Sequence, residues 1–306
     1  MRSIVKLFIG ICSMALILSG CSSGKGSGNE AIKVATVTTT ESAIMGNMIK
    51  LMIEHYTDES VEMINNLGSS VVVHQAMVNG DANISASRYT GTDLTGALGE
   101  EPIKSPEKAM KTVQKLFDED YNQTFFDSYG FANTYAFMVN KETAKKYNLK
   151  KVSDLKKVAD KMEAGVDTSW MNRPGDGYKA FVKDYGFDFG KVYPMQIGLV
   201  YDAVEAGKMD VVLGYTTDGR IASYDLVVLE DDLHFFPPYD CSPLATNELL
   251  KAKPEVKKVL EKLIDTVSTE EMQKLNYESD NNLLEPAIVA EKFLEKHNYF
   301  EDKGGE

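Results

Sequence analysis

One unit of local sequence occurs twice in this chain, and this repeat constrains the fold more than any other feature. Each copy reads as a helix, a stopping glycine, a short hydrophobic strand and a tyrosine at the strand's end. The copies span residues 70–89, ending at Tyr89, and residues 197–215, ending at Tyr215. Because ligands of α/β sheets bind beyond the carboxyl ends of parallel strands, the repeat predicts two α/β lobes that direct tyrosines toward a shared cleft. Helix–glycine–strand order is also common by coincidence, so the repeat alone identifies no function.

Hydrophobic periodicity predicts further elements around the repeat. Residues 32–37 have the pattern of a strand, and Thr38 to Thr40 are suited to cap a helix that follows. Residues 61–64 predict a second strand. Helices are also expected after Pro254, Ser268 and Pro286, and the simplest interpretation is that they cover a sheet.

The N-terminus has the layout of a cleaved export signal. Two basic residues precede an apolar run over residues 9–18, which is too short to span a membrane comfortably. Leu-Ser-Gly-Cys then ends at Cys21 and resembles a bacterial lipobox, in which the cysteine is acylated. We therefore expect a lipoprotein signal peptide over residues 1–20, a flexible tether over 21–30 and a lipid anchor on the outer face of the cell membrane. An ordinary secretory signal with a chance cysteine is the alternative.

Composition and motifs favour binding over catalysis. The formal net charge of −13 disfavours nucleic acid as a partner. Cys241 is the only cysteine outside the predicted signal and lipidation site, so no disulfide is expected. Common catalytic motifs are absent, and the four histidines lack metal-ligand spacing. We expect no enzyme activity, no cofactor and no metal site.

Four segments together resemble one family, the substrate-binding lipoproteins of osmoprotectant ABC importers. They are R-Y-T-G-T-D-L at 88–94, G-F-A-N-T-Y-A at 130–136, R-P-G-D-G-Y at 173–178 and Y-T-T-D-G-R-I at 215–221. The resemblance implies the α/β type II periplasmic-binding-protein fold, with two α/β lobes joined by two crossing strands and a ligand cleft between them. It implies lobe I over 31–133 and 237–306, and lobe II over 134–236.

The resemblance also implies a ligand site for glycine betaine, carnitine or choline. The family's aromatic cage falls here on Tyr89, Tyr135, Tyr215 and Tyr239. A trimethylammonium group has no N–H donor, so aromatic faces suit it through cation–π and apolar contact. For the anionic end, the implied residues are Arg173, Thr92 and, less specifically, Asn133.

The sequence leaves several alternatives open. Val37-Thr38-Thr39 stands where some family members have a lysine or glutamine donor, so either a donor to the ligand's carboxylate is lost or a threonine hydroxyl replaces it, and the exact ligand stays open. Trp170 is either a core residue or an extension of the pocket, and Asp218 and Arg220 are expected to form a structural pair. The resemblance implies a monomer that delivers its ligand to a membrane permease powered by a cytosolic ATPase. A receptor specific for choline or another amine, and an anchored enzyme acting on quaternary amines, are the alternative functions.

Overall fold

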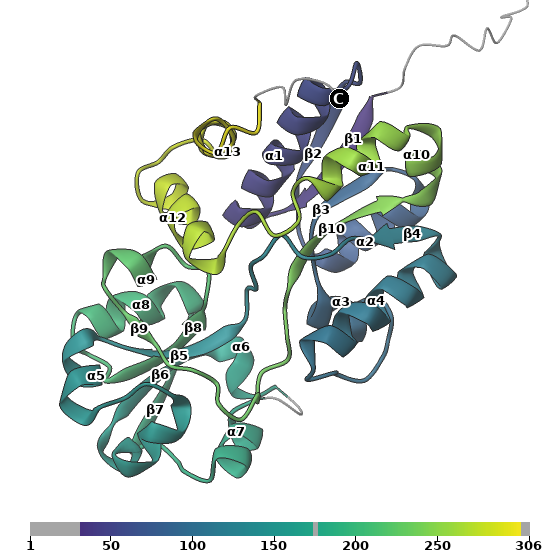
Figure 1. Cartoon of the computed structure of the whole chain (residues 1–306). Helices are drawn as coiled ribbons and strands as arrows, with labels where there is room; N and C mark the ends of the chain where they lie inside the picture. Colours follow the sequence, from purple (N-terminus) through teal and green to yellow (C-terminus); the bar gives the residue numbers. More distant parts are fainter. Residues whose placement is uncertain (1–30, 174–176, 301–306) are drawn as a thin grey trace, which may run out of the picture. The chain divides into compact units, whose positions relative to one another are not determined.

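The computed structural model describes residues 31–173 and 177–300, and two five-stranded sheets organise them (Figure 1). The predicted signal peptide, the tether and Cys21 lie outside the described residues. The first sheet has the order β2-β1-β3-β10-β4, formed by β1 (Ile32–Val37), β2 (Val61–Leu67), β3 (Ile84–Tyr89), β4 (Gln123–Phe125) and β10 (Cys241–Thr246). The second has the order β7-β6-β8-β5-β9, formed by β5 (Tyr135–Val139), β6 (Glu163–Asp167), β7 (Lys191–Met195), β8 (Val211–Tyr215) and β9 (Val227–Val228).

Each sheet is mixed, with three parallel strands on one side and antiparallel pairings on the other. Strand β1 pairs in parallel with β2 and β3, whereas β10 runs antiparallel to β3 and β4. Strand β6 pairs in parallel with β7 and β8, whereas β5 runs antiparallel to β8 and β9. Tyr89 and Tyr215 therefore occupy the carboxyl ends of β3 and β8, as the repeat predicts.

Lobe I, the lobe built on the first sheet, has a hydrophobic layer on each face. Along β1, Ile32 and Val34 join one core cluster, while Ala35 and Val37 join the other, because successive strand residues point to opposite faces. The covering helices are α1 (Thr40–Tyr56), α2 (Ser70–Asn79), α3 (Thr90–Gly96), α4 (Pro106–Tyr121), α10 (Asn247–Ala252), α11 (Pro254–Glu261), α12 (Thr269–Asp280) and α13 (Pro286–Lys296). The predicted helix starts after Pro254, Ser268 and Pro286 are confirmed.

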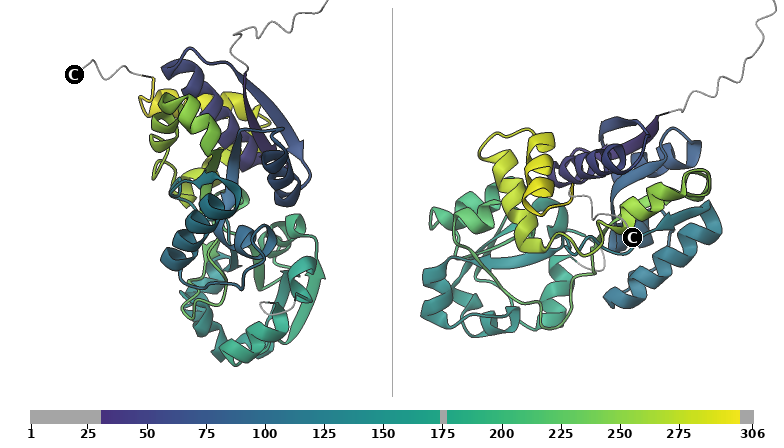
Figure 2. Two further views of the ribbon diagram at one scale, coloured as in Figure 1. Left: turned by 90° about the vertical axis from the view of Figure 1, so that its right-hand side faces the viewer. Right: turned by 45° about the horizontal axis from the view of Figure 1, so that its top comes forward.

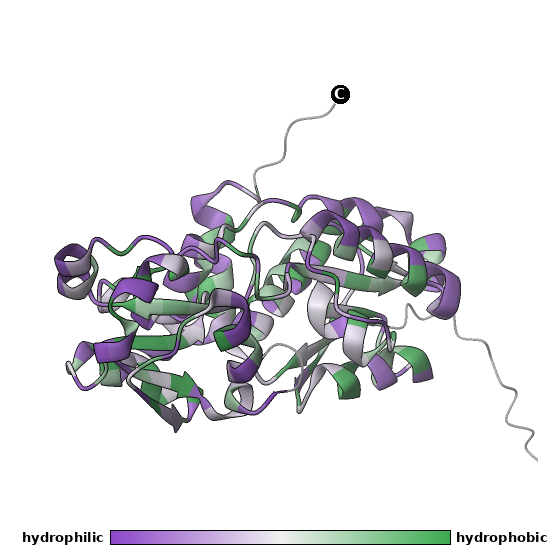
Figure 3. Cartoon of the chain, turned by 90° about the horizontal axis from the view of Figure 1, so that it is seen from below, coloured by the Kyte–Doolittle hydropathy of each residue, from purple (hydrophilic) through white to green (hydrophobic). Residues whose placement is uncertain are grey.

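Lobe II, built on the second sheet, follows the same rule. On β5, Tyr135 and Phe137 face an aromatic cluster, whereas Ala136 and Met138 face α8. The helices are α5 (Lys141–Tyr147), α6 (Thr168–Met171), α7 (Tyr178–Tyr185), α8 (Ile197–Glu205) and α9 (Arg220–Ser223), with short 3₁₀ helices at Val152–Lys157 and Ala159–Lys161. Figure 3 shows hydrophobic strands inside both lobes and hydrophilic residues concentrated on the surrounding helices.

Local signals explain where the helices beside the cleft begin and end. The side chains of Thr39 and Ser69 accept hydrogen bonds from backbone N–H groups in the first turns of α1 and α2. Gly80 ends α2 in the left-handed conformation, with φ of 78°, which glycine adopts without a Cβ penalty. The predicted helix–glycine–strand unit is thus confirmed in both copies, although α8 ends at Glu205, two residues before Gly207.

Two crossing segments connect the sheets, residues 126–134 between β4 and β5 and residues 229–240 between β9 and β10 (Figure 2). They pair through an antiparallel bridge between Ala132 and Asp240. The structure adds a third connection, since Gln273 and Asn276 of α12 donate hydrogen bonds to the backbone just beyond β8. The tail helix α12 therefore braces the two lobes as well as covering a sheet. Among the described residues, no helix is long and apolar enough to cross a membrane.

Candidate functional site

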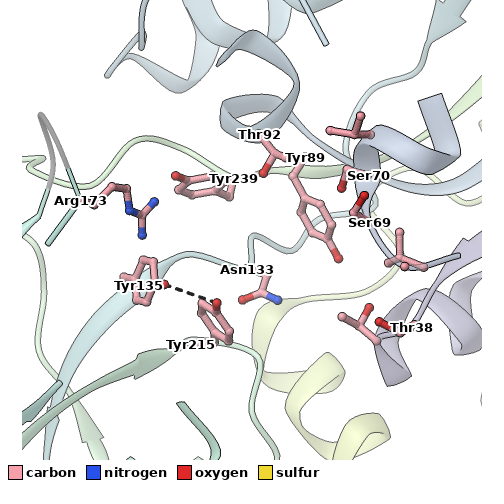
Figure 4. A pocket seen from close by; sticks show the side chains of 14 residues that line it. Thr38, Ser69, Ser70, Tyr89, Thr92, Asn133, Tyr135, Arg173, Tyr215 and Tyr239 are labelled. Atoms are coloured by element: carbon pink, nitrogen blue, oxygen red, sulfur yellow. Dashed lines mark hydrogen bonds between the residues drawn. The ribbon is translucent and has the colours of Figure 1, made fainter. Parts of the chain in front are cut away.

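A cavity of about 470 Å³ lies where the ends of the two sheets meet, and residues of both lobes line it (Figure 4). All seven residues predicted from the sequence border this one cavity: Tyr89, Thr92, Asn133, Tyr135, Arg173, Tyr215 and Tyr239. Thr38 and Thr39, at the position where the sequence left a substitute donor open, also border the cavity, and so do Ser69 and Ser70 at the start of α2, which the sequence did not identify. Phenol rings and polar donors therefore share the same space.

Two of the rings come from neighbouring strands of lobe II. Tyr135 of β5 lies directly opposite Tyr215 of β8, and their ring centroids are 4.9 Å apart. The Tyr135 hydroxyl donates a hydrogen bond of 2.6 Å to Asp167, a carboxylate that is only 4% exposed. Burial, and then this hydrogen bond, raise the pKa of Tyr135 far above its usual value, so the phenol stays protonated. The guanidinium of Arg173 lies 5.0 Å from the centroid of the same ring, which is within the range of a cation–π contact.

The backbone of Tyr215 is fixed by a buried tyrosine behind it. The hydroxyl of Tyr201 accepts from the Tyr215 N–H at 2.7 Å and donates to the Tyr215 carbonyl at 3.2 Å. Gly214 permits this approach, because a Cβ there would lie 2.8 Å from the Tyr201 ring. Arg220 lies 4.5 Å from the centroid of Tyr201 and pairs with Asp218 at 2.8 Å. The predicted pair of Asp218 and Arg220 is therefore confirmed, and it supports the cage from behind.

A third ring, Tyr89, is held by a residue that the sequence did not single out. Its hydroxyl donates to Glu41 in the first turn of α1, and the Asn133 Nδ2 donates to the same carboxylate oxygen at 2.7 Å. Glu41 is 3% exposed. Burial and the neighbouring carboxylate raise the pKa of Tyr89 well above its usual value, so the phenol remains a donor. No sequence signal distinguishes Glu41 from the other acidic residues of the chain.

The R-Y-T-G-T-D-L segment owes much of its composition to a buried ion pair. Arg88 and Asp93 are fully buried and joined by two hydrogen bonds, one of them 2.9 Å long from Nε to Oδ2. The Arg88 Nη1 also donates to the carbonyl of Ser70 at 3.1 Å. This pair joins the end of β3, α3 and the start of α2. It thereby positions Tyr89 and Thr92, which flank its members.

The fourth ring, Tyr239, comes from the second crossing segment. Its carbonyl accepts from the N–H of Asn133 at 3.2 Å, so the two crossing segments are paired at the cavity. Gly91 allows this segment to approach α3, because a Cβ there would lie 2.6 Å from the carbonyl oxygen of Pro238 and 3.1 Å from a ring carbon of Tyr239. The four rings that border the cavity therefore come from both sheets and from the second crossing segment.

Burial decides the role of Trp170 and the accessibility of Cys241. Trp170 is fully buried and packs against Phe137, with ring centroids 6.0 Å apart, so it is a core residue behind the cage. Cys241 is a buried free thiol. Within residues 31–173 and 177–300, no group of three or more histidine, cysteine, aspartate or glutamate side chains could hold a metal ion.

Comparisons with known proteins place the chain in one family. Residues 30–296 match the family described as the substrate-binding domain of ABC-type glycine betaine transport systems. The carnitine transport binding protein of Listeria monocytogenes is 58% identical over 305 residues, covering 97% of this chain and 99% of that protein. A combined ergothioneine permease and binding protein of Helicobacter pylori is 32% identical over 86% of this chain and 47% of its own length.

A solved structure is also similar to this chain in both sequence and fold. A crystal structure described as a glycine betaine/carnitine/choline ABC transporter superposes with a TM-score of 0.86 at 60% identity, covering 88% of this chain and all of that one. The expected type II periplasmic-binding-protein fold is confirmed by this match and by the two α/β lobes. The chain belongs to the family of substrate-binding domains of ABC-type glycine betaine transport systems, which are extracytoplasmic solute-binding components of importers.

Proposed function

We propose that this protein captures quaternary-ammonium solutes such as glycine betaine, carnitine and choline in its tyrosine cage and delivers them to an ABC permease. The observation that carries the proposal is the convergence of four phenol rings, from both lobes and a crossing segment, on one cavity. We further propose that the protein acts as a monomeric lipoprotein anchored through Cys21, with lobes divided at 133/134 and 236/237, and that a cytosolic ATPase powers import.

The cage chemistry suits a methylated cation. A trimethylammonium group spreads its charge over methyl groups and offers no proton, so a ring face supplies both its negative quadrupole and apolar contact. Each desolvated contact contributes about 1–2 kcal/mol. Four such contacts supply several kcal/mol, which is appropriate for micromolar binding at about −8 kcal/mol. Among the described residues that border the cavity none is a carboxylate, so these side chains offer small hydrated cations no charged ligand.

Polar groups on two sides of the cavity suit a carboxylate, Arg173 on one side and the residues beside α1 and α2 on the other (Figure 4). Arg173 offers a planar, bidentate donor, and Thr92 offers a neutral hydroxyl. The N-termini of α1 and α2, with Thr38 and Ser69 beside them, add the partial positive charge of helix ends. These groups can replace the lysine or glutamine donor that some family members have in the Val37-Thr38-Thr39 position.

The division of the cage between lobes suggests how binding is coupled to delivery. Tyr89 belongs to lobe I, whereas Tyr135 and Tyr215 belong to lobe II. A ligand that contacts all of them binds a closed arrangement better than an open one, and this difference in affinity drives closure. The permease would then recognise the closed form.

Titration calorimetry on a soluble form that starts after Cys21 tests the proposal. Tyr89→Ala, Tyr215→Ala and Tyr239→Ala are each expected to weaken glycine betaine binding by about tenfold or more. Tyr147→Ala is the matched control, because Tyr147 is 38% exposed on α5, away from the cavity. Unchanged affinity in all three cage variants would remove the assignment.

The same assay tests the anionic subsite and the choline alternative. Arg173→Ala is expected to weaken carnitine and glycine betaine binding more than choline binding, because choline has no carboxylate. Equal losses contradict the role of Arg173. A wild-type protein that binds choline but neither carboxylated ligand supports a narrow choline receptor. Mass spectrometry after prolonged incubation with betaine and choline would reveal turnover by an enzyme.

A further inference from the structure

We propose that Glu41 is a positioning residue of the cage, whose single buried carboxylate sets both the Tyr89 ring and the Asn133 amide. This inference rests on the proposed function. Glu41 does not border the cavity. It acts through Tyr89 and Asn133, two residues that do.

The surroundings of Glu41 are unusual for a structural carboxylate. Its side chain is almost fully buried, and none of the ion pairs formed by the described residues includes it. Burying a carboxylate without a cation is costly, so hydrogen bonds and a local field must compensate for the lost hydration. Here the compensation comes from two donors, the Tyr89 phenol and the Asn133 amide, and from the N-terminal turn of α1.

Both donors converge on the same oxygen, Oε1, so the carboxylate fixes their relative positions. Tyr89 is the last residue of β3, and Asn133 lies in the first crossing segment. The N–H of Asn133 in turn holds the carbonyl of Tyr239. One oxygen of Glu41 therefore links the Tyr89 ring of lobe I to the first crossing segment, beside Tyr239.

Glu41 also determines which way the Asn133 amide points. A carboxylate only accepts hydrogen bonds, so it selects the NH₂ end of the amide. The Oδ1 atom must then face away from Glu41. It is buried, has no hydrogen-bond partner among the described residues, and lies on the Tyr215 side of the cavity (Figure 4). The Asn133 carbonyl dipole therefore has its negative end beside the cavity.

The Tyr89 hydrogen bond has a related electrostatic effect. A phenol that donates to a charged acceptor is polarised, so its ring becomes more electron-rich. An electron-rich face attracts a cation more strongly. Glu41 thus favours a cation without touching it, and without offering a metal ion a direct ligand.

A double-mutant cycle measured by calorimetry with glycine betaine tests this role. Glu41→Gln keeps the shape and one acceptor but removes the charge, and we expect about tenfold weaker binding. The matched control is Glu54→Gln on the same helix, which changes the net charge equally at a partly exposed pair with Lys50 and should leave affinity unchanged. In a Tyr89→Phe background, Glu41→Gln should weaken glycine betaine binding by about threefold or less, because the hydrogen bond from the Tyr89 hydroxyl is already absent.

Each outcome is informative. Unchanged affinity in Glu41→Gln overturns the proposal, and so does an equal loss with and without the Tyr89 hydroxyl, which indicates a general packing defect. If thermal unfolding shows that Glu41→Gln does not fold, Glu41→Asp replaces it. This variant keeps the charge but moves the acceptor oxygens back by one methylene. Wild-type affinity in Glu41→Asp also overturns the proposal. If the wild-type protein binds no quaternary ammonium compound, the proposed function fails instead.

Discussion

Removing the charge of Asp93 should destabilise lobe I strongly, because this residue is half of a fully buried ion pair. In Asp93→Asn, Arg88 keeps its charge at 0% exposure and loses its ionic partner. Breaking a buried pair in this way costs about 3–5 kcal/mol. With a urea dependence of about 3 kcal/mol per molar, the unfolding midpoint should fall by roughly 1 M or more. Affinity for ligand should fall too, since Tyr89 and Thr92 flank the pair.

Urea unfolding followed by far-ultraviolet circular dichroism measures this change. The matched control is Asp120→Asn, an exposed aspartate near the end of α4, which should shift the midpoint little. The double variant Arg88→Met/Asp93→Leu removes both charges and should recover much of the stability, because buried pairs often exchange neutrally for packed apolar residues. An Asp93→Asn midpoint equal to that of the control refutes the reasoning.

Three further predictions concern packing and ionisation. Gly91→Ala should weaken ligand binding by about tenfold while the protein stays folded, because a Cβ there collides with the second crossing segment. Gly96→Ala, with open space around it, is the control. Calorimetry that shows equal affinities for the two variants contradicts the prediction. The Cys241 thiol should resist modification by a chromogenic disulfide until the protein unfolds, because it is buried; prompt stoichiometric labelling of the native soluble form argues against this burial. The folded-state pKa values of Tyr89 and Tyr135 lie above the unfolded value, so stability should be complete below about pH 10 and decline above it; a melting temperature that stays constant well beyond about pH 10 contradicts this sign.

The sequence predicts local elements well where the signals are local. The strand at β1, the cap of α1 at Thr39 and the stop of α2 at Gly80 follow from alternation and from cap chemistry within a few residues. The repeat also placed Tyr89 and Tyr215 at strand ends. These features depend on the backbone's immediate neighbours, which the sequence displays directly.

Features that depend on distant packing could not be predicted in the same way. Glu41 resembles any acidic residue in a first helical turn. It is buried by β3 and the first crossing segment, whose contacts Tyr89 and Asn133 lie 48 and 92 residues further along the chain. Likewise, the tail pattern indicates that α12 is a helix but not that Gln273 and Asn276 reach lobe II. The motif at 88–94 contains a buried ion pair between Arg88 and Asp93, and the sequence alone did not predict that these two residues are buried together.

A crystal structure of the soluble protein with glycine betaine tests the central claim most directly. We predict that the quaternary nitrogen lies within about 6 Å of the ring centroids of Tyr89, Tyr135, Tyr215 and Tyr239, with the carboxylate toward Arg173. A ligand bound elsewhere, or bound with those rings turned away from its methyl groups, contradicts the account.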